Sequence, residues 1–166
     1  MKLYLIRHSN AIDPGTPDYE DDSQRPLTEK GRDKMYKIAS ALKELGVKPD
    51  LIVSSPYIRA RQTADILAKV LKYKPELTIS ETLIPMGNAD DIVGEINEKY
   101  SVDELVLIGH EPSLSGLIGT LVAGNPEIDV NLKNGGVCCL SADDLHTDRK
   151  AVLEWLLPPK ILTALS

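Results

Sequence analysis

Two of the three histidines in this chain follow the same local pattern. His8 follows the sequence LYLIR and His110 follows LVLIG, so four apolar residues and one further residue precede each imidazole. Each apolar run is typical of a buried strand in a parallel sheet. The carboxyl ends of parallel strands form the edge at which open α/β folds bind ligands. Neighbouring strands lie about 5 Å apart, so if these two strands are neighbours, the imidazoles face each other across a cleft.

Arginines bring positive charge to the same edge. Arg7 directly precedes His8, and Arg59 falls in the first turn of an expected helix, where free backbone N–H groups and the helix dipole favour an anion. Arg61 lies about 200° further around that helix, so only one of the two can face the site, and the first-turn position favours Arg59. Two histidines and two arginines form a pocket suited to a tetrahedral dianion such as phosphate or sulfate.

Alternating strands and helices are expected to position these side chains. Short apolar runs predict strands at 3–6, 50–53, 77–79, 105–108, 136–140 and 152–157, the last a candidate antiparallel edge strand. Helical spacing predicts helices at 28–45, 56–71, 89–98 and from 112 to about 124. Thr28 is expected to cap the first helix, and Ser55 the second, with Pro56 at its first position. The alternation predicts one α/β domain over 1–166, a three-layer αβα sandwich with a mainly parallel central sheet.

Composition excludes several classes of protein. The chain has 166 residues, 42% of them hydrophobic and 27% charged, and a net charge of −6, which argues against nucleic acid as a partner. No apolar run approaches the roughly 20 residues of a membrane span, and no secretory signal is apparent, so we expect a cytoplasmic protein without membrane association. Cys138 and Cys139 are adjacent and are expected to point to opposite faces of a strand as core residues. The three histidines lack metal-ligand spacing, with His146 in a polar run typical of a loop, so we expect no metal and no cofactor.

The segment 9–26 has no periodicity. It contains three prolines, one glycine and five acidic residues. Irregular segments of this length in a small domain are either functional or disordered. It is therefore either a solvated loop or a lid over the end of the first strand.

Three stretches together resemble the signature of the histidine phosphatase superfamily, which is phosphoglycerate-mutase-like. They are LIRH at 5–8, SSPYIRARQTA at 54–64 and IGHEP at 108–112, and their order and spacing match along nearly the whole chain. The short length, RPLTEKG at 25–31, LIPMG at 83–87 and Trp155 to Pro158 resemble the SixA-type branch, the phosphohistidine phosphatases.

This resemblance implies roles for the residues at the predicted sheet edge. His8 would attack phosphorus through a neutral ring nitrogen and carry the phosphoryl group until water removes it. Arg7, Arg59 and His110 would hold the phosphoryl oxygens as charge develops. Arg25 would either add a contact from the segment 9–26 or hold that segment in place. The branch also implies a phosphorylated protein as the partner, such as a histidine phosphotransfer domain.

Ser9 departs from the pattern of the superfamily, which usually has glycine after Arg-His. A serine is strained if the position needs a positive φ. Alternatively, its hydroxyl donates a hydrogen bond to the phosphate.

The residue at the position of the general acid is the second departure from the pattern of the superfamily. Larger members of the superfamily place a glutamate soon after the third strand, and the aligned residue here is Pro85, with Glu81 nearby but off register. The acids Asp13, Asp18 and Asp22 in the segment 9–26 are the remaining candidates. A P–N bond depends less on an acid than a P–O bond does, because the leaving imidazole can depart already protonated. The departure therefore favours phosphohistidine as the substrate.

Three functions stay open on the sequence. The first is a phosphatase that acts on phosphohistidine of a partner protein, in keeping with the short connection after the third strand and hence an open site. The second is a phosphomonoester phosphatase of small molecules with a loop aspartate as its acid. The third is a catalytically weak module that binds phosphoproteins.

Overall fold

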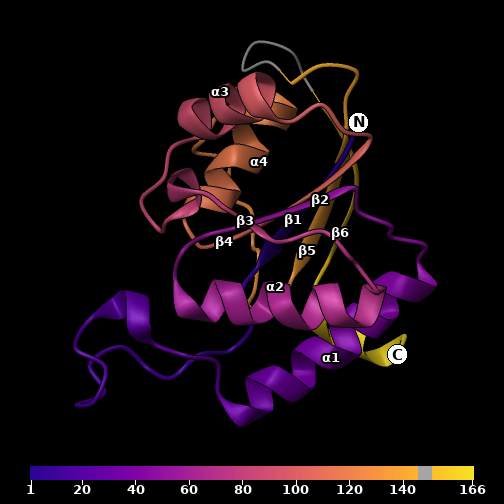
Figure 1. Cartoon of the computed structure of the whole chain (residues 1–166). Coiled ribbons are helices and arrows are strands. Elements are labelled where there is room, and N and C mark those ends of the chain that lie inside the picture. The colour runs from indigo at the N-terminus through magenta and orange to yellow at the C-terminus, as the bar shows by residue number, and fades with distance from the viewer. Residues whose placement is uncertain (146–150) are drawn as a thin grey trace.

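A six-stranded sheet forms the centre of the molecule in the computed structural model, which describes residues 1–145 and 151–166 (Figure 1). In sheet order the strands are β3 (Thr78–Ile79), β2 (Leu51–Ser54), β4 (Glu104–Gly109), β1 (Lys2–Arg7), β5 (Val137–Ser141) and β6 (Val152–Leu157). The first four run parallel, β5 is antiparallel to β1, and β6 is antiparallel to β5 at the edge. The mainly parallel sheet and its antiparallel edge strand are thus confirmed. His146, expected in a loop, lies outside the described residues.

Helices cover both faces of the sheet (Figure 1). One face carries α1 (Glu29–Glu44), α2 (Ile58–Leu71) and α5 (Pro159–Ala164), and the other carries α3 (Ala89–Lys99) and α4 (Ser113–Ala123). Two 3₁₀ helices, η1 (Asp22–Gln24) and η2 (Glu81–Leu83), lie in the connections. The expected three-layer αβα sandwich is confirmed. No described helix is long and apolar enough to cross a membrane.

The strands are apolar on both faces because each face packs against a helical layer. In β1, Tyr4 and Ile6 join the core under α1 and α2, whereas Leu3 and Leu5 join the core under α3 and α4. The two cysteines of β5 follow the same alternation: Cys139 lies in the first core and Cys138 in the second, both as buried free thiols. This continuous burial explains why the two histidine-bearing strands read as unbroken apolar runs.

Helix α1 begins where its sequence predicts. The Thr28 hydroxyl accepts a hydrogen bond from the Gly31 N–H at 2.9 Å, and Gly46 follows the helix with φ of +81°. Helix α2 begins later than expected, at Ile58, with Tyr57 as its N-cap and no side-chain cap. Ser55 therefore lies two residues before the N-cap, and its hydroxyl accepts from the Tyr57 N–H at 3.3 Å and lies 2.8 Å from a ring nitrogen of His110.

The segment 9–26 packs against the carboxyl end of the sheet. Ala11 forms an isolated bridge with Leu27, and Arg25 is buried. The 3₁₀ helix η1 contacts α2. This segment therefore reaches the place where the two histidines leave their strands.

Candidate active site

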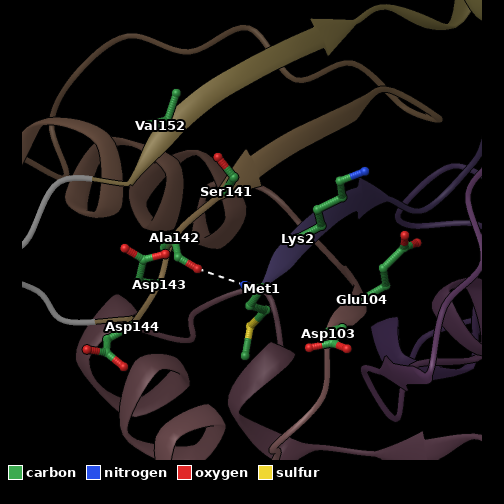
Figure 2. A pocket seen from close by; sticks show the side chains of 9 residues that line it. All are labelled: Met1, Lys2, Asp103, Glu104, Ser141, Ala142, Asp143, Asp144 and Val152. Atoms are coloured by element: carbon green, nitrogen blue, oxygen red, sulfur yellow. Dashed lines mark hydrogen bonds between the residues drawn. The ribbon is translucent and has the colours of Figure 1, made fainter.

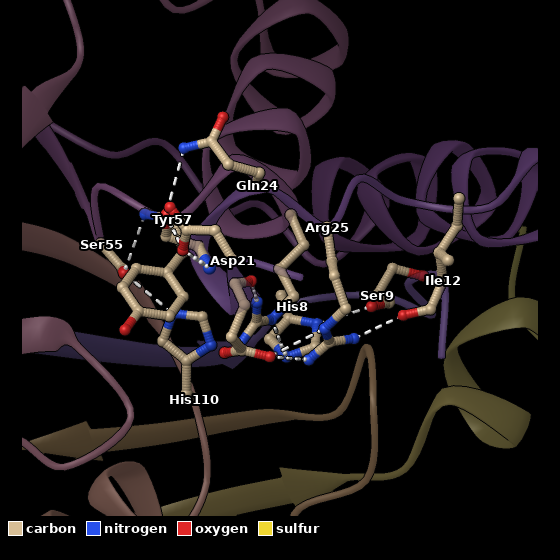
Figure 3. Close-up of polar contacts among 12 residues, drawn as sticks. His8, Ser9, Ile12, Asp21, Gln24, Arg25, Ser55, Tyr57 and His110 are labelled. Carbon is tan, nitrogen blue, oxygen red and sulfur yellow. Dashed lines mark hydrogen bonds and ion pairs between the residues drawn. The ribbon is translucent and has the colours of Figure 1, made fainter. Parts of the chain in front are cut away.

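The two histidines lie opposite each other at the carboxyl ends of neighbouring strands. β1 and β4 pair in parallel with Arg7 opposite Gly109, so the next residue of each strand is a histidine. The rings of His8 and His110 are 5.0 Å apart between centroids, with an angle of 55° between their planes. Both side chains are buried, and Figure 3 shows the rings facing each other. The repeated strand pattern thus produces the expected pair of imidazoles.

The hydrogen bonds of His8 fix which ring nitrogen carries the hydrogen and which carries the lone pair. Nδ1 lies 2.7 Å from the carbonyl oxygen of Ser9. Because a carbonyl oxygen only accepts hydrogen bonds, Nδ1 carries the hydrogen and Nε2 keeps the lone pair. Arg59 donates from Nε to Nε2 at 3.2 Å, in agreement with this tautomer. His8 therefore directs a nucleophilic nitrogen toward the arginines.

Burial and neighbouring cations keep both imidazoles neutral at pH 7. Burial lowers the pKa of His8 to about 3, with Arg59, Arg7 and Arg25 adding to the shift against the opposing hydrogen bond to Ser9. Burial also lowers the pKa of His110 to about 2, and the adjacent His8 and Arg59 contribute. A neutral imidazole is the form that can act as a nucleophile.

Three arginines surround the histidines. Arg59, in the first turn of α2, is buried and donates from Nη1 to the carbonyl oxygen of Asp22 at 2.7 Å and from Nη2 to its carboxylate at 2.9 Å. Arg7 donates from Nη1 to the carbonyl oxygen of Leu132 at 3.0 Å. Arg25, from the segment 9–26, also faces the site (Figure 3). Arg61 is exposed, so Arg59 is the arginine of that pair that faces the site.

These groups enclose a cavity of about 310 Å³. Its lining residues are Arg7, His8, Asn10, Ala11, Asp13, Pro14, Asp22, Arg25, Arg59, Pro85, His110, Glu111 and Asn134. In the part of the chain that the structure describes, Nε of Arg7 and Nδ1 of His110 are buried without a hydrogen-bond partner. A cavity with positive charge and unused donors suits a tetrahedral anion.

A larger hollow of about 520 Å³ lies at the opposite end of the same strands (Figure 2). It contains the N-terminal ammonium group, which donates to the carbonyl oxygen of Ala142 at 2.8 Å, and acidic side chains such as Asp103 and Glu104. Acids in place of arginines make that end unsuited to a dianion. Among the described residues, no group of three or more His, Cys, Asp or Glu could hold a metal ion.

Comparison with known proteins identifies the family. A model of the histidine phosphatase superfamily (branch 1) matches residues 3–88, just over half of the chain. An uncharacterized protein of Picosynechococcus sp. is 34% identical over 95% of this chain and 100% of that protein. The chain belongs to the histidine phosphatase superfamily.

Solved structures of the superfamily share the fold over nearly the whole chain. The protein histidine phosphatase SixA in complex with tungstate matches with a TM-score of 0.83 and 24% identity, covering 98% of this chain and 99% of that one. A putative phosphohistidine phosphatase SixA from Agrobacterium tumefaciens matches with a TM-score of 0.75 and 22% identity, covering 95% and 98%. The resemblance of the sequence to the superfamily is confirmed, and these SixA structures share the fold of the chain.

Ser9 occupies the position at which this superfamily usually has glycine, but it does not line the cavity. Its hydroxyl donates to the carbonyl oxygen of Gly31 at 2.8 Å, and its N–H donates to the hydroxyl of Thr63 at 3.1 Å. Lys72 alone among the described non-glycine residues has a positive φ, so the backbone at Ser9 is unstrained. The condition for strain at Ser9 is therefore not met, and the hydrogen bond to Gly31 of α1 directs the Ser9 hydroxyl away from the cavity, so the expected contact with phosphate is not supported.

The candidate general acids divide between cavity and surface. Asp13 and Asp22 line the cavity, as does Pro85, whereas Asp18 and Glu81 are not among its lining residues. Partial burial raises the pKa of Asp22, but hydrogen bonds from Arg25 and Arg59 outweigh this effect and hold the pKa below its usual value. Asp22 is therefore ionised at pH 7 and has no proton to donate.

Several residues that shape the site were not predicted from the sequence. Tyr57 places its ring 5.0 Å from that of His110 and 4.9 Å from the guanidinium carbon of Arg59. Ser55, expected as a helix cap, instead contacts His110, and Asn134 donates from its side-chain amide to the carbonyl oxygen of His8 at 3.3 Å. Tyr57 and Ser55 lie within the stretch 54–64 and could have been found by their spacing from Arg59. No local pattern marks Asn134.

Proposed function

We propose that this chain is a metal-independent phosphatase in which His8 accepts the phosphoryl group of the substrate and water then removes it. The observation that carries this proposal is the orientation of His8, whose Nδ1 is tied to the Ser9 carbonyl while Nε2 keeps its lone pair toward the arginines. In the first step, Nε2 forms a bond to phosphorus as the bond to the leaving group breaks. In the second, water attacks the phosphohistidine and Nε2 recovers its lone pair.

The arginines and His110 supply the charge stabilisation that this reaction needs. Nε of Arg7 and Nδ1 of His110 have no partner among the described residues. The Ser55 hydroxyl accepts from the Tyr57 N–H at 3.3 Å, and its hydrogen can then go to Nε2 of His110. That arrangement places the ring hydrogen on Nδ1, where His110 can donate to a phosphoryl oxygen. Donors fixed in advance are usually the largest contribution to phosphoryl transfer.

We propose phosphohistidine as the substrate because the site offers little help to an alkoxide leaving group. Pro85 stands where the acid of larger members aligns, and Asp22 is held as an ion pair. The imidazole of phosphohistidine can leave already protonated, so it needs no such acid. The structural match to proteins named as SixA phosphohistidine phosphatases supports the same substrate.

A groove beside the phosphate pocket favours a protein as the carrier of that phosphohistidine. The groove has a volume of about 440 Å³, and it shares Pro85 with the phosphate pocket. Its lining is largely apolar or small: Pro85, Met86, Gly87, Asn88, Ala89, Asp90, Pro112, Ser113, Gly116, Thr120, Gly124 and Pro126. Met86 is 81% exposed beside it, and an exposed methionine suits contact with an apolar side chain of a partner. A histidine phosphotransfer domain would present its phosphohistidine to the cavity and a neighbouring apolar residue to the groove.

Asp13 favours a second candidate function, a phosphomonoester phosphatase of small molecules. Its side chain is exposed and lines the cavity, so it could protonate an alkoxide. In that case Asp13→Asn would lower turnover of phosphate esters by about 10²–10⁴-fold.

A substrate panel tests the proposal. The purified protein is assayed with a histidine-phosphorylated phosphotransfer domain, phosphoramidate, phosphoserine, sugar phosphates and p-nitrophenyl phosphate, each with wild type, His8→Ala and Asp13→Asn. We expect the two P–N substrates to be hydrolysed fastest, by a route that needs His8 but not Asp13. Faster hydrolysis of esters that depends on Asp13 would support the second function. Binding of the phosphoprotein without turnover would show a binding module instead.

A further inference from the structure

Asp22 takes hydrogen bonds from two of the three arginines that line the phosphate pocket. Its Oδ1 accepts from Nε of Arg25 at 2.8 Å and lies 2.7 Å from Nη2 of the same residue. Its Oδ2 accepts from Nη2 of Arg59 at 2.9 Å, and its carbonyl oxygen accepts from Nη1 of Arg59 at 2.7 Å. Asp22 thus occupies guanidinium nitrogens of both Arg25 and Arg59 that could otherwise bind a substrate anion.

The remaining nitrogens of these two arginines are also engaged. Nη1 of Arg25 donates to the carbonyl oxygen of Ile12 at 2.5 Å, and Nε of Arg59 donates to Nε2 of His8 at 3.2 Å. Arg7 and His110 differ, because each has a buried nitrogen with no partner among the residues described. The polar groups of the pocket therefore divide into Arg7 and His110, which each keep a nitrogen without a partner, and Arg25 and Arg59, whose nitrogens are engaged.

We propose that the Asp22 carboxylate is an internal anion that competes with the substrate for Arg25 and Arg59 and so lowers the affinity of any anion that needs both arginines. The inference rests on the proposed phosphate-binding role of this pocket. A phosphoryl group held first by Arg7 and His110 displaces the carboxylate and takes over its hydrogen bonds. A phosphoryl dianion has more charge and more acceptor oxygens than the carboxylate, so it wins this exchange, whereas a singly charged anion gains little.

The position of Asp22 permits such an exchange. Its side chain is 50% exposed, against 4% for Arg59 and 10% for Arg25. The carboxylate can therefore turn into solvent while the arginines stay in place.

Binding of inorganic phosphate tests this inference without any need for turnover. Titration calorimetry at one pH and ionic strength compares wild type with Asp22→Asn and Asp22→Ala, and with Glu20→Gln as the control. Glu20 is an exposed acid of the same segment that does not line the cavity, so this control changes the net charge equally. We expect about threefold to tenfold tighter phosphate binding in both Asp22 variants, the gain from removing a half-exposed ionic competitor. Glu20→Gln is expected to stay within about twofold of wild type.

Unchanged or weaker phosphate binding in both Asp22 variants would overturn the inference and make Asp22 a residue that positions the arginines. Dimethyl phosphate, a singly charged relative of the ligand, supplies the selectivity measurement. Dimethyl phosphate gains little from Arg25 and Arg59 and therefore loses little while the carboxylate occupies them. The ratio of phosphate affinity to dimethyl phosphate affinity is therefore expected to rise in Asp22→Asn, and an unchanged or lower ratio would contradict the competition. Phosphoramidate hydrolysis by wild type is measured separately: its absence would refute the proposed function, whereas the binding data alone decide the role of Asp22.

Discussion

At the scale of single residues, the site depends on how His8 and His110 are surrounded. Each ring has one nitrogen tied to a neighbouring oxygen, the Ser9 carbonyl for His8 and the Ser55 hydroxyl for His110. Because burial keeps both rings neutral, these hydrogen bonds decide which ring nitrogen carries the hydrogen before a substrate binds. The arginines then provide the charge that the buried imidazoles lack.

The buried histidines should make stability depend on pH. The folded-state pKa of His8 is lowered to about 3, below the unfolded value of about 6.5. The unfolded state therefore binds more protons between these values, and the free energy of unfolding falls as pH decreases from about 6.5. We expect each histidine to contribute up to about 1.4 kcal/mol per pH unit.

Urea unfolding of wild type and His8→Asn at pH 5–7 measures this contribution. The variant should show a shallower loss of stability toward pH 5, because one of the two groups is gone. Equal slopes for the two proteins would mean that His8 titrates normally in the folded state.

Alanine variants of Arg59 and Arg61 form a matched pair that tests the role of positive charge in the site. Arg59 is buried and contacts His8, whereas Arg61 is two residues further along α2 and exposed. Arg59→Ala should lower kcat/KM by about 10²–10³-fold, the size typical of a lost donor to a transition-state oxyanion. Arg61→Ala should stay near wild type. Steady-state kinetics on phosphoramidate measures this difference, and melting curves confirm that both variants fold. A mild effect of Arg59→Ala would mean that another arginine stabilises the phosphoryl oxygens.

At the level of helices and strands, hydrophobic periodicity predicted the regular elements. It missed features that depend on contacts between segments far apart in the sequence. The two apolar runs before His8 and His110 were sufficient to predict strands that end at one sheet edge. The start of α2 was expected at Pro56, two residues before Ile58, and no local rule could show that the Ser55 hydroxyl contacts His110. The α5 helix and η1 went unpredicted, being only 6 and 3 residues long. The contacts of Asp22 in η1 with α2 likewise join segments far apart in the sequence.

Gly31 is the point where α1 meets the segment 9–26. A Cβ there would lie 2.0 Å from the carbonyl oxygen of Asn10, whereas a Cβ at Gly94, an exposed position in α3, would have nothing within 4 Å. Gly31→Ala should therefore destabilise the protein by about 1–3 kcal/mol and lower activity by moving the residues after His8. Gly94→Ala should stabilise it by about 0.5–1 kcal/mol.

Thermal unfolding and phosphoramidate kinetics of the two glycine variants test this contact. If Gly31→Ala were as stable and as active as Gly94→Ala, the segment 9–26 would not be packed against α1 as the structure shows.

At the scale of the whole molecule, the sheet gathers a site from all parts of the chain. His8 follows β1, Arg59 lies in α2 and His110 follows β4, while Arg25 comes from the long connection before α1. The strand order β2-β4-β1 places the ends of these elements side by side. The groove that contains Met86 continues the same face, so a partner protein can contact both at once.

Substitution of Met86 tests whether the molecule recognises a protein substrate through the groove. Met86→Ala should lower kcat/KM for a histidine-phosphorylated phosphotransfer domain by at least about fivefold, the loss expected for an interface residue worth about 1 kcal/mol. Hydrolysis of phosphoramidate should stay within about twofold, because a small substrate does not reach the groove. Ile161→Ala is the control, since Ile161 is an apolar residue of α5 that is 46% exposed. Equal losses for both substrates would mean that Met86 acts on the phosphate pocket rather than on a partner.

Trapping the phosphorylated intermediate shows whether His8 itself carries the phosphoryl group. The protein is mixed with a phosphorylated substrate, quenched in base within milliseconds to seconds, and digested for mass spectrometry, with His8→Ala treated in parallel. The proposed chemistry requires an acid-labile phosphoryl group on the peptide that contains His8 and its loss in the variant together with turnover. Turnover retained by His8→Ala, or a phosphoryl group found on another residue, would contradict it.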